Sequence, residues 1–210
     1  MFTTKIQHKP CKRTFDIIFS LLSLTLGLPL FLILTFIVRV SSPGKAIFGH
    51  ERIGRGGQPF RCYKFRTMYK DADQRLNELL KIDAALKSEW ETSFKLKNDP
   101  RITPIGKILR KTSLDELPQL WNILIGDLSV VGPRPVVQDE LIKYFGEKAN
   151  IVLSIRPGLT GLWQVSGRSD ISYNDRILLE EEYVNNQSFF LDLKLIAKTL
   201  PAIFTSKGAY

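Results

Sequence analysis

Two adjacent carboxylates, Asp115 and Glu116, are the residues of this chain best suited to chemistry. They stand in the segment Arg110–Asn122, with cationic side chains close on both sides in sequence. A carboxylate can bind a divalent cation or attack a phosphorus atom, and an arginine can hold phosphate oxygens through paired hydrogen bonds. The pair is therefore suited to phosphoryl chemistry.

The same segment also has a purely structural explanation. Ser113 and Glu116 match a capping box, in which each side chain accepts a hydrogen bond from a free backbone N–H at the start of a helix. The apolar stripe of that helix would be Leu117, Leu120, Trp121 and Leu124. In the functional alternative, the helix N-terminus lowers the pKa of Asp115, keeps it ionised at neutral pH and attracts phosphate.

Three further basic segments flank the pair. They are Lys64–Met68, Gly132–Pro135 and Arg156–Arg168. Each could be only a structural loop. An Arg-Pro sequence, however, places a guanidinium on a stiff backbone, and this arrangement suits phosphate recognition. We therefore treat these segments as candidate phosphate-binding loops.

An apolar stretch near the N-terminus predicts a membrane segment. Residues 17–38 carry no charge and, as a helix, would be roughly 33 Å long, enough to cross a hydrocarbon core. No small-residue cleavage site follows, which argues against a signal peptide. Pro29 lies near the middle, and both flanks are basic. Two topologies fit these features. One is a hairpin that enters and leaves the membrane on one face, and the other is a single span with a tolerated proline.

The remainder predicts one compact α+β domain of about 170 residues. We expect strands at 46–50 and 60–65 around a glycine-rich turn, a polar surface helix or helix pair at 71–96, and an amphipathic helix at 102–109. That last helix would lie on a membrane surface or pack into the core. Cys11 and Cys62 form no disulfide framework, and the net charge of +9 indicates an anionic partner.

Taken in order, the motifs resemble the bacterial sugar transferase family, the monotopic phosphoglycosyl transferases. The resemblance covers nearly the whole chain. It rests on Lys12, Arg13 and Asp16, on the apolar stretch, and on the segments 64–68, 113–119, 132–135, 156–158 and 161–168. Segments 94–101 and 207–210 are most similar to the undecaprenyl-phosphate galactose or glucose phosphotransferases. Larger members carry extra membrane spans, so we expect this chain to correspond to the catalytic unit.

The resemblance implies a reaction and a site. A UDP-sugar gives hexose 1-phosphate to undecaprenyl phosphate and releases UMP, in the first membrane step of exopolysaccharide, lipopolysaccharide O-antigen or capsule synthesis. Asp115 is the nucleophile and forms a covalent phosphosugar. Glu116 supports it, and both hold Mg²⁺. The implied substrate-binding residues are Lys64, Arg66, Arg110, Arg134, Gln164 and Arg168. Galactose is favoured over glucose, although Asn186-Gln-Ser188 departs from the family's usual Asn-Trp-Ser.

The resemblance also implies a topology. Residues 1–41 would form a basic N-terminus and a re-entrant helix bent at Pro29, despite Leu28 in place of the usual serine. Residues 42–210 would form a catalytic domain with interfacial amphipathic helices on the cytoplasmic face of the inner membrane. Membrane lipids would then be partners, and the sequence does not decide between a monomer and a homodimer. The alternatives are transfer of an N-acetylated sugar and a membrane-anchored scaffold without activity. No nucleic-acid module is found, so nucleic acid ranks last as a partner.

Overall fold

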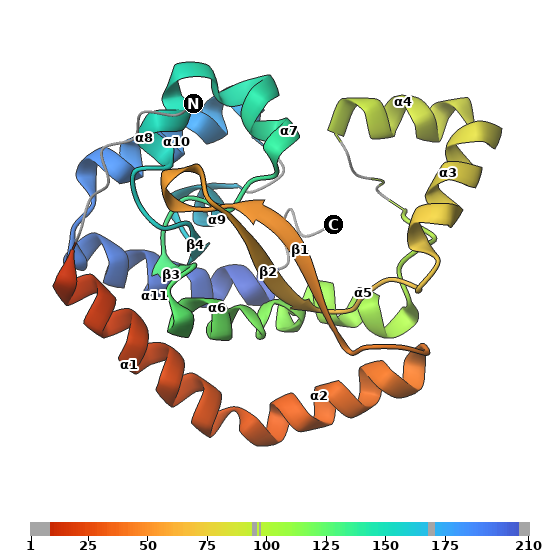
Figure 1. The fold of residues 1–210 in the computed structure, drawn as a ribbon, viewed down its shortest axis with the longest axis horizontal. Coiled ribbons are helices and arrows are strands. Elements are labelled where there is room, and N and C mark those ends of the chain that lie inside the picture. The colour runs from red at the N-terminus through yellow and green to blue at the C-terminus, as the bar shows by residue number, and fades with distance from the viewer. Residues whose placement is uncertain (1–8, 94–95, 97, 168–170, 206–210) are drawn as a thin grey trace.

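A computed structural model describes residues 9–93, 96, 98–167 and 171–205 of the chain. Two N-terminal helices, α1 (Pro10–Leu26) and α2 (Leu28–Ser41), form a wide V along one side of a mostly helical domain (Figure 1). Of the residues named from the sequence, residues 1–8, 94, 95 and 97, Arg168 and the segment 207–210 lie outside the described residues. The α+β class is confirmed.

The V is bent by 65° at the junction of α1 and α2. Within the described ranges, no single helix is long and apolar enough to cross a membrane, whereas this bent pair meets the requirement together. Pro29 stands in the first turn of α2, where its missing N–H costs no helical hydrogen bond. At Gly27 a Cβ atom would lie 2.6 Å from the Ser23 carbonyl oxygen, so the junction also requires a glycine. The expected break near Pro29 is confirmed.

A β-hairpin crosses the middle of the domain. Strand β1 (Ile47–Ile53) pairs with β2 (Pro59–Phe65) in antiparallel register, with Ile47 opposite Phe65 and Ile53 opposite Pro59. The turn η1 (Arg55–Gly57) closes the hairpin with positive φ angles of 71° at Gly56 and 78° at Gly57. The predicted hairpin is confirmed, and both strands are longer than expected.

A second sheet was not predicted from the sequence. The strands β3 (Ser129–Val131) and β4 (Gly158–Thr160) run parallel to each other. Each has only three residues, too few for a clear alternation of apolar and polar side chains. The two backbones approach so closely that a Cβ atom on Gly158 would lie 2.0 Å from the Gly132 amide nitrogen. This sheet and the surrounding helices enclose the main core, which includes Ile123, Tyr183 and Leu195.

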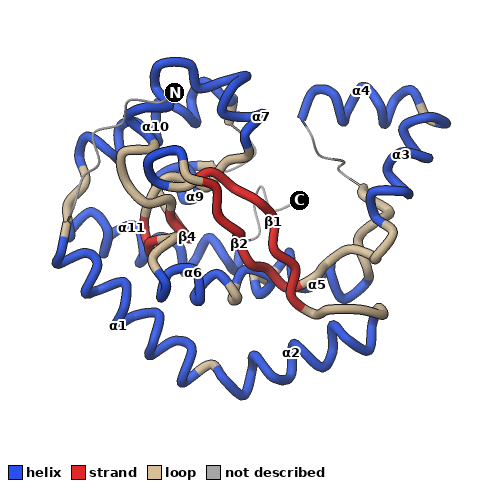
Figure 2. The backbone as a smooth tube through the Cα atoms, in the orientation of Figure 1, coloured by secondary structure: helices blue, strands red, loops and turns tan. Residues whose placement is uncertain are grey.

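Helices make up most of the remaining chain (Figure 2). They are α3 (Ala72–Ile82), α4 (Ala84–Ser93), α5 (Pro104–Lys111), α6 (Gln119–Ile125), α7 (Gln138–Glu140), α8 (Ala149–Val152), α9 (Leu162–Ser166), α10 (Tyr173–Asn186) and α11 (Phe189–Thr205), with short turns η2 (Leu114–Glu116), η3 (Leu141–Phe145) and η4 (Gly146–Lys148). The predicted surface helix is the pair α3 and α4. On α5, Leu109 is buried and Ile108 is exposed, so this helix has both a core face and an outward face.

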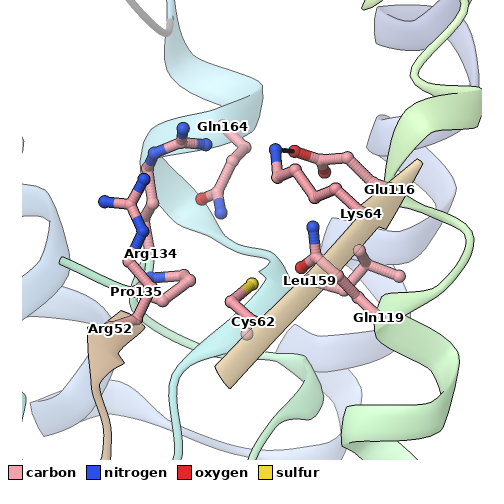
Figure 3. A pocket seen from close by; sticks show the side chains of 10 residues that line it. Arg52, Cys62, Lys64, Glu116, Gln119, Arg134, Pro135, Leu159 and Gln164 are labelled. Carbon is pink, nitrogen blue, oxygen red and sulfur yellow. Dashed lines mark hydrogen bonds and ion pairs between the residues drawn. The ribbon is translucent and has the colours of Figure 1, made fainter. Parts of the chain in front are cut away.

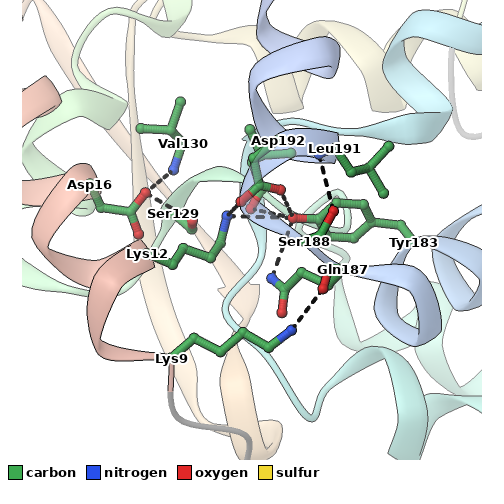
Figure 4. Close-up of polar contacts among 11 residues, drawn as sticks. Lys9, Lys12, Asp16, Ser129, Val130, Tyr183, Gln187, Ser188, Leu191 and Asp192 are labelled. Atoms are coloured by element: carbon green, nitrogen blue, oxygen red, sulfur yellow. Dashed lines mark hydrogen bonds and ion pairs between the residues drawn. The ribbon is translucent and has the colours of Figure 1, made fainter.

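The start of α1 is bound to the domain by polar contacts (Figure 4). Asp16 Oδ1 accepts hydrogen bonds from the Ser129 hydroxyl at 3.0 Å and from the Val130 N–H at 2.9 Å. Lys12 Nζ lies 2.7 Å from Asp192 Oδ2 on α11. The Arg13 guanidinium donates to the carbonyls of residues 123 and 124, at the C-terminal end of α6. These contacts fix the N-terminal end of the V.

The other arm of the V is bound to the same domain. The rings of Phe31 on α2 and Phe65 on β2 have centroids 4.9 Å apart, and Leu34 and Val38 are buried beside them. Beyond α2, the Arg66 guanidinium donates to the Ser42 and Pro43 carbonyls. Both arms are therefore attached to one domain and diverge from a bend that lies away from it.

A buried amide joins the hairpin to α6. Asn122 is fully buried; its Oδ1 accepts the Tyr63 N–H at 2.9 Å, and its Nδ2 donates to the Arg61 carbonyl at 2.7 Å. Asn122→Leu leaves these partners unsatisfied, so we expect a loss of about 3 kcal/mol in unfolding free energy. Thermal unfolding in detergent measures this loss of stability. Ile125→Leu, on the exposed side of the same helix, is the matched control. An unchanged melting temperature for Asn122→Leu would contradict this role.

Candidate active site

The carboxylate pair lies in η2, immediately before α6. Ser113 has a positive φ of 57° and its side chain caps no helix N–H. The predicted capping box is therefore wrong. Its physical obstacle is Pro118: a helix begun at Ser113 would need the Pro118 N–H for its first turns, and proline has none. The chain instead makes one tighter turn, and α6 begins at Gln119.

The hairpin brings a lysine to the pair. Lys64 Nζ lies 2.5 Å from Glu116 Oε1 and 3.7 Å from Asp115 Oδ2. Burial of the Asp115 carboxyl raises its pKa to about 6, with Lys64 and Arg110 opposing the rise and Glu116 adding to it. The expected lowering of this pKa is therefore wrong, because burial outweighs any favourable charge. At pH 7 Asp115 is still about nine-tenths ionised, as a nucleophile requires.

A small pocket opens beside Lys64 and Glu116. Arg52 and Arg134 lie on its opposite side, and Gln164 stands between the two sides (Figure 3). Cationic groups thus face the pocket from β1, from β2 and from the loop after β3. Such a lining favours an anionic ligand that lies next to the carboxylates.

The parallel strands bring two of the predicted phosphate-binding loops together. The Gly132 N–H donates to the Thr160 carbonyl at 2.9 Å, and the Gly158 N–H donates to the Pro133 carbonyl at 2.7 Å. The segments 132–135 and 156–161, separate in sequence, therefore form one wall. This wall carries Arg134 into the pocket, and α9 follows with Gln164.

Two predicted phosphate-binding arginines lie outside the pocket lining. Arg66 is engaged with carbonyls at the end of α2. Arg110 donates to the Thr67 hydroxyl at 2.9 Å and is close enough to Asp115 to oppose the rise of its pKa. Lys64, Arg134 and Gln164 are brought together with Glu116 around one pocket, and Asp115 lies beside it.

Sequence reasoning missed Arg52, Cys62 and Gln119, which also line the pocket. In an antiparallel hairpin, directly opposed residues share a face. Arg52 lies opposite residue 60, so it shares the face that also carries Cys62 and Lys64 at alternate positions of β2. The alternation of side chains along β2 could have predicted that Cys62 and Lys64 share a face. Only the pairing register with β1 places Arg52 on that face.

Asp115 and Glu116 form a donor set that suits Mg²⁺. This ion is commonly held in proteins by one or two carboxylates, with substrate phosphates and waters as the other ligands. Across the described ranges, no cluster of three or more His, Cys, Asp or Glu side chains could form an all-protein cage. The ammonium group of Lys64, in contact with both carboxylates, marks a position where positive charge is favourable.

Fold and site together define a small α+β protein with a bent apolar helix pair and a cationic pocket beside a buried carboxylate. Such a site can bind a phosphorylated ligand next to a nucleophile. The chain belongs to the bacterial sugar transferase family, whose sequence model matches residues 7–206. The family resemblance drawn from the motifs is thereby confirmed.

Individual relatives are similar over most of this chain. Exopolysaccharide production protein ExoY of Rhizobium meliloti is 50% identical over 199 residues, which are 95% of this chain and 88% of that protein. The undecaprenyl-phosphate galactose phosphotransferase of Salmonella typhimurium is 49% identical over 199 residues, 95% of this chain but 41% of the relative. The UDP-glucose:undecaprenyl-phosphate glucose-1-phosphate transferase of Caulobacter vibrioides is 34% identical over 206 residues, which cover 95% of this chain and 72% of that protein.

Proposed function

We propose that this protein transfers hexose 1-phosphate from a UDP-hexose to undecaprenyl phosphate and releases UMP. The observation that carries the proposal is Asp115, a buried but ionised carboxylate beside a pocket lined by Lys64, Arg52 and Arg134. The names of the Salmonella and Caulobacter relatives support undecaprenyl phosphate as acceptor and galactose or glucose as the sugar. Galactose is favoured, and an N-acetylated sugar is the alternative.

The proposed reaction has two displacements at one phosphorus atom. A carboxylate oxygen of Asp115 attacks the β-phosphorus of the donor, and the bond from that phosphorus to the bridging oxygen breaks. UMP leaves with the bonding electrons. An oxygen of undecaprenyl phosphate then attacks the same phosphorus, and the bond to Asp115 breaks. The products are the lipid diphosphate sugar and the free carboxylate.

The other pocket residues bind and orient the diphosphate in this scheme. Arg52 and Arg134 hold its oxygens from one side, and Lys64 holds them from the other once the substrate separates it from Glu116. Asp115 and Glu116 would hold Mg²⁺, which supplies charge neutralisation for the diphosphate. That Arg66, Arg110 and Arg168 contact the substrate stays a prediction. Of the three, Arg110 lies near Asp115.

The bent helix pair is proposed to enter and leave the membrane on its cytoplasmic face. Both arms are attached to the same domain, so a straight span would have to break one set of anchors. Large apolar side chains are exposed along both arms, including Leu22, Leu26 and Phe36, as expected for contact with lipid. The lipid acceptor would then reach the pocket from the same surface.

The direct test is a donor panel. Purified protein in detergent, with undecaprenyl phosphate and Mg²⁺, should release UMP in a lipid-dependent reaction, fastest with UDP-galactose or UDP-glucose. UDP-N-acetylglucosamine and UDP-N-acetylgalactosamine test the alternative sugar. A non-catalytic scaffold releases no UMP with any donor, and that outcome would overturn the proposal. Tight, steeply salt-dependent binding to DNA would instead favour a nucleic-acid partner.

The rate should fall at low pH, because Asp115 becomes protonated there and is then no longer a nucleophile. Because this pKa is raised to about 6, kcat/KM should drop about tenfold for each pH unit below that value. Lys64 lowers the pKa, so Lys64→Met should move the acid limb to higher pH, whatever it does to the maximum rate. The exposed Lys70→Met is the control. A wild-type limb that stays near pH 4 as the Mg²⁺ concentration is lowered would contradict this environment for Asp115.

A further inference from the structure

Another buried carboxyl, which the proposed chemistry does not use, contacts the backbone of Arg134 in the pocket wall. Glu180 on α10 is only 1% exposed. Its Oε1 accepts the backbone N–H of Arg134 at 2.9 Å, and its Oε2 has no hydrogen-bond partner among the described residues. Burial raises the pKa of Glu180 to about 7, against the opposing influence of the Arg134 N–H and of the guanidinium groups of Arg176 and Arg134.

The Arg134 side chain is positioned against an aromatic ring. Its guanidinium carbon lies 5.2 Å from the centroid of the Trp163 ring, and that of Arg176 lies 4.9 Å from the same centroid. Arg176 is 5% exposed and also lies 5.4 Å from the centroid of Tyr173, which stacks on Tyr144 at 4.1 Å. Rings and cations thus form a continuous stack from the pocket wall to α10.

The stack holds the Arg134 side chain, whereas the peptide that joins Pro133 to Arg134 is held by the Gly158 N–H on the Pro133 carbonyl and by Glu180 on the Arg134 N–H. The indole constrains the guanidinium through a cation–π contact, which is a weak interaction in an open pocket. The backbone of Arg134 lies between two prolines in the sequence Gly132–Pro135, so neighbouring amides offer no N–H to hold it. The Arg134 N–H is therefore the one backbone donor of the Pro-Arg-Pro sequence, and Glu180 is its acceptor.

We propose that Glu180 is a positioning residue for the donor diphosphate, and that it acts through Arg134 by holding its backbone N–H so that the guanidinium faces the pocket. The identity of the ligand rests on the proposed function. The competing explanation is that Glu180 only joins α10 to the loop after β3. The two differ in whether its effect on ligand binding depends on the Arg134 side chain.

A matched pair of variants tests the hydrogen bond. Glu180→Gln keeps an oxygen that accepts the Arg134 N–H, whereas Glu180→Met has a similar length and offers only a weakly accepting sulfur. We expect Glu180→Met to weaken binding of Mg–UDP, measured by calorimetry, about tenfold and to raise the donor KM similarly. Glu180→Gln should stay within about threefold of wild type. Equal loss in both variants, or no loss in either, would overturn the inference.

The dependence on Arg134 is tested by a double-mutant cycle. If Glu180 acts through Arg134, then Glu180→Met in an Arg134→Ala background should change the Mg–UDP dissociation constant less than about twofold. A full tenfold effect in that background overturns the inference, because Glu180 then acts without the Arg134 side chain. If Glu180→Met does not fold, Glu180→Asp replaces it: it retracts the carboxyl from the N–H but keeps the same chemical group, and severalfold weaker binding is expected.

The binding readout separates this inference from the proposed function. A wild-type protein that binds Mg–UDP but releases no UMP would remove the proposed function and leave the role of Glu180 to be decided by the cycle. A wild-type protein that neither binds Mg–UDP nor releases UMP overturns both, and one that releases UMP without binding Mg–UDP overturns only the role of Glu180. An active wild type with independent effects of the two substitutions overturns only the role of Glu180.

Discussion

Asp115→Asn should lower UMP release by at least about a thousandfold and should also make the protein more stable. The rate falls because an amide is a poor nucleophile and a poor metal ligand. Burial has raised the pKa of this carboxyl from its ordinary value of 3.8 to about 6. The folded protein therefore binds a proton more readily than the unfolded chain between these values. Ionisation of Asp115 thus costs folding free energy, up to about 3 kcal/mol above pH 6.

The stability part of this prediction has a definite pH dependence. The difference in melting temperature between Asp115→Asn and wild type should be a few degrees at pH 7.5 and should shrink towards pH 5, where the wild-type carboxyl is protonated. Asp71→Asn, at an exposed carboxylate, is the control and should leave the rate near wild type. Near-wild-type turnover of Asp115→Asn would remove this residue as nucleophile. A phosphosugar trapped on Asp115 in the wild type, identified by mass spectrometry, would support it.

Neither flank of the helix pair should be reachable from outside the cell. Cysteines placed at positions 5 and 45, in a Cys11→Ser and Cys62→Ser background, should both escape a membrane-impermeant thiol reagent in intact cells. Both should react after permeabilisation. This all-or-none result follows because the two arms of the V are attached to one domain. Labelling at position 5 but not at position 45 would show a single span instead.

Removing the proline tests what holds the bend. Pro29→Ala restores a backbone N–H and allows α1 and α2 to join into one straight helix. Part of the population should then expose position 5, and activity should fall because the pocket loses its placement relative to the lipid phosphate. Pro43→Ala, outside the helices, is the matched control. Unchanged labelling and rate in Pro29→Ala would assign the bend to Gly27 and to the anchors of α1 and α2.

Local patterns predicted those parts of the fold that depend on neighbouring residues. The hairpin followed from β-forming residues on either side of glycines, and the bend followed from Pro29. The parallel pair β3 and β4 could not be predicted this way, because its stability comes from contacts between segments about thirty residues apart, such as Gly132 and Thr160. The failed capping box shows a related limit: Ser113 and Glu116 fit the pattern, but Pro118 removes a hydrogen bond from the helix that the pattern requires.

The candidate site was only partly visible in the sequence. Asp115, Glu116 and Arg134 were selected because charged residues beside prolines and glycines form recognisable motifs. Arg52 has no such motif, and only the register of the hairpin places it on the pocket face. The direction of the Asp115 pKa shift was also beyond the sequence, since it depends on burial, which no local pattern reports.

The ion pair between Lys12 and Asp192 spans 180 positions of the chain. During synthesis at about 5–20 residues per second, Asp192 leaves the ribosome roughly 10 to 40 seconds after Lys12. Val130 and the C-terminal carbonyls of α6, the other anchors of α1, also come late. The first arm of the V lacks these contacts until residues 123–130 have been made, and it lacks the contact with Asp192 until later. Until then, Gly27, Pro29 and the contact between Phe31 and Phe65 set the shape of the first forty residues, and the later contacts fix that shape.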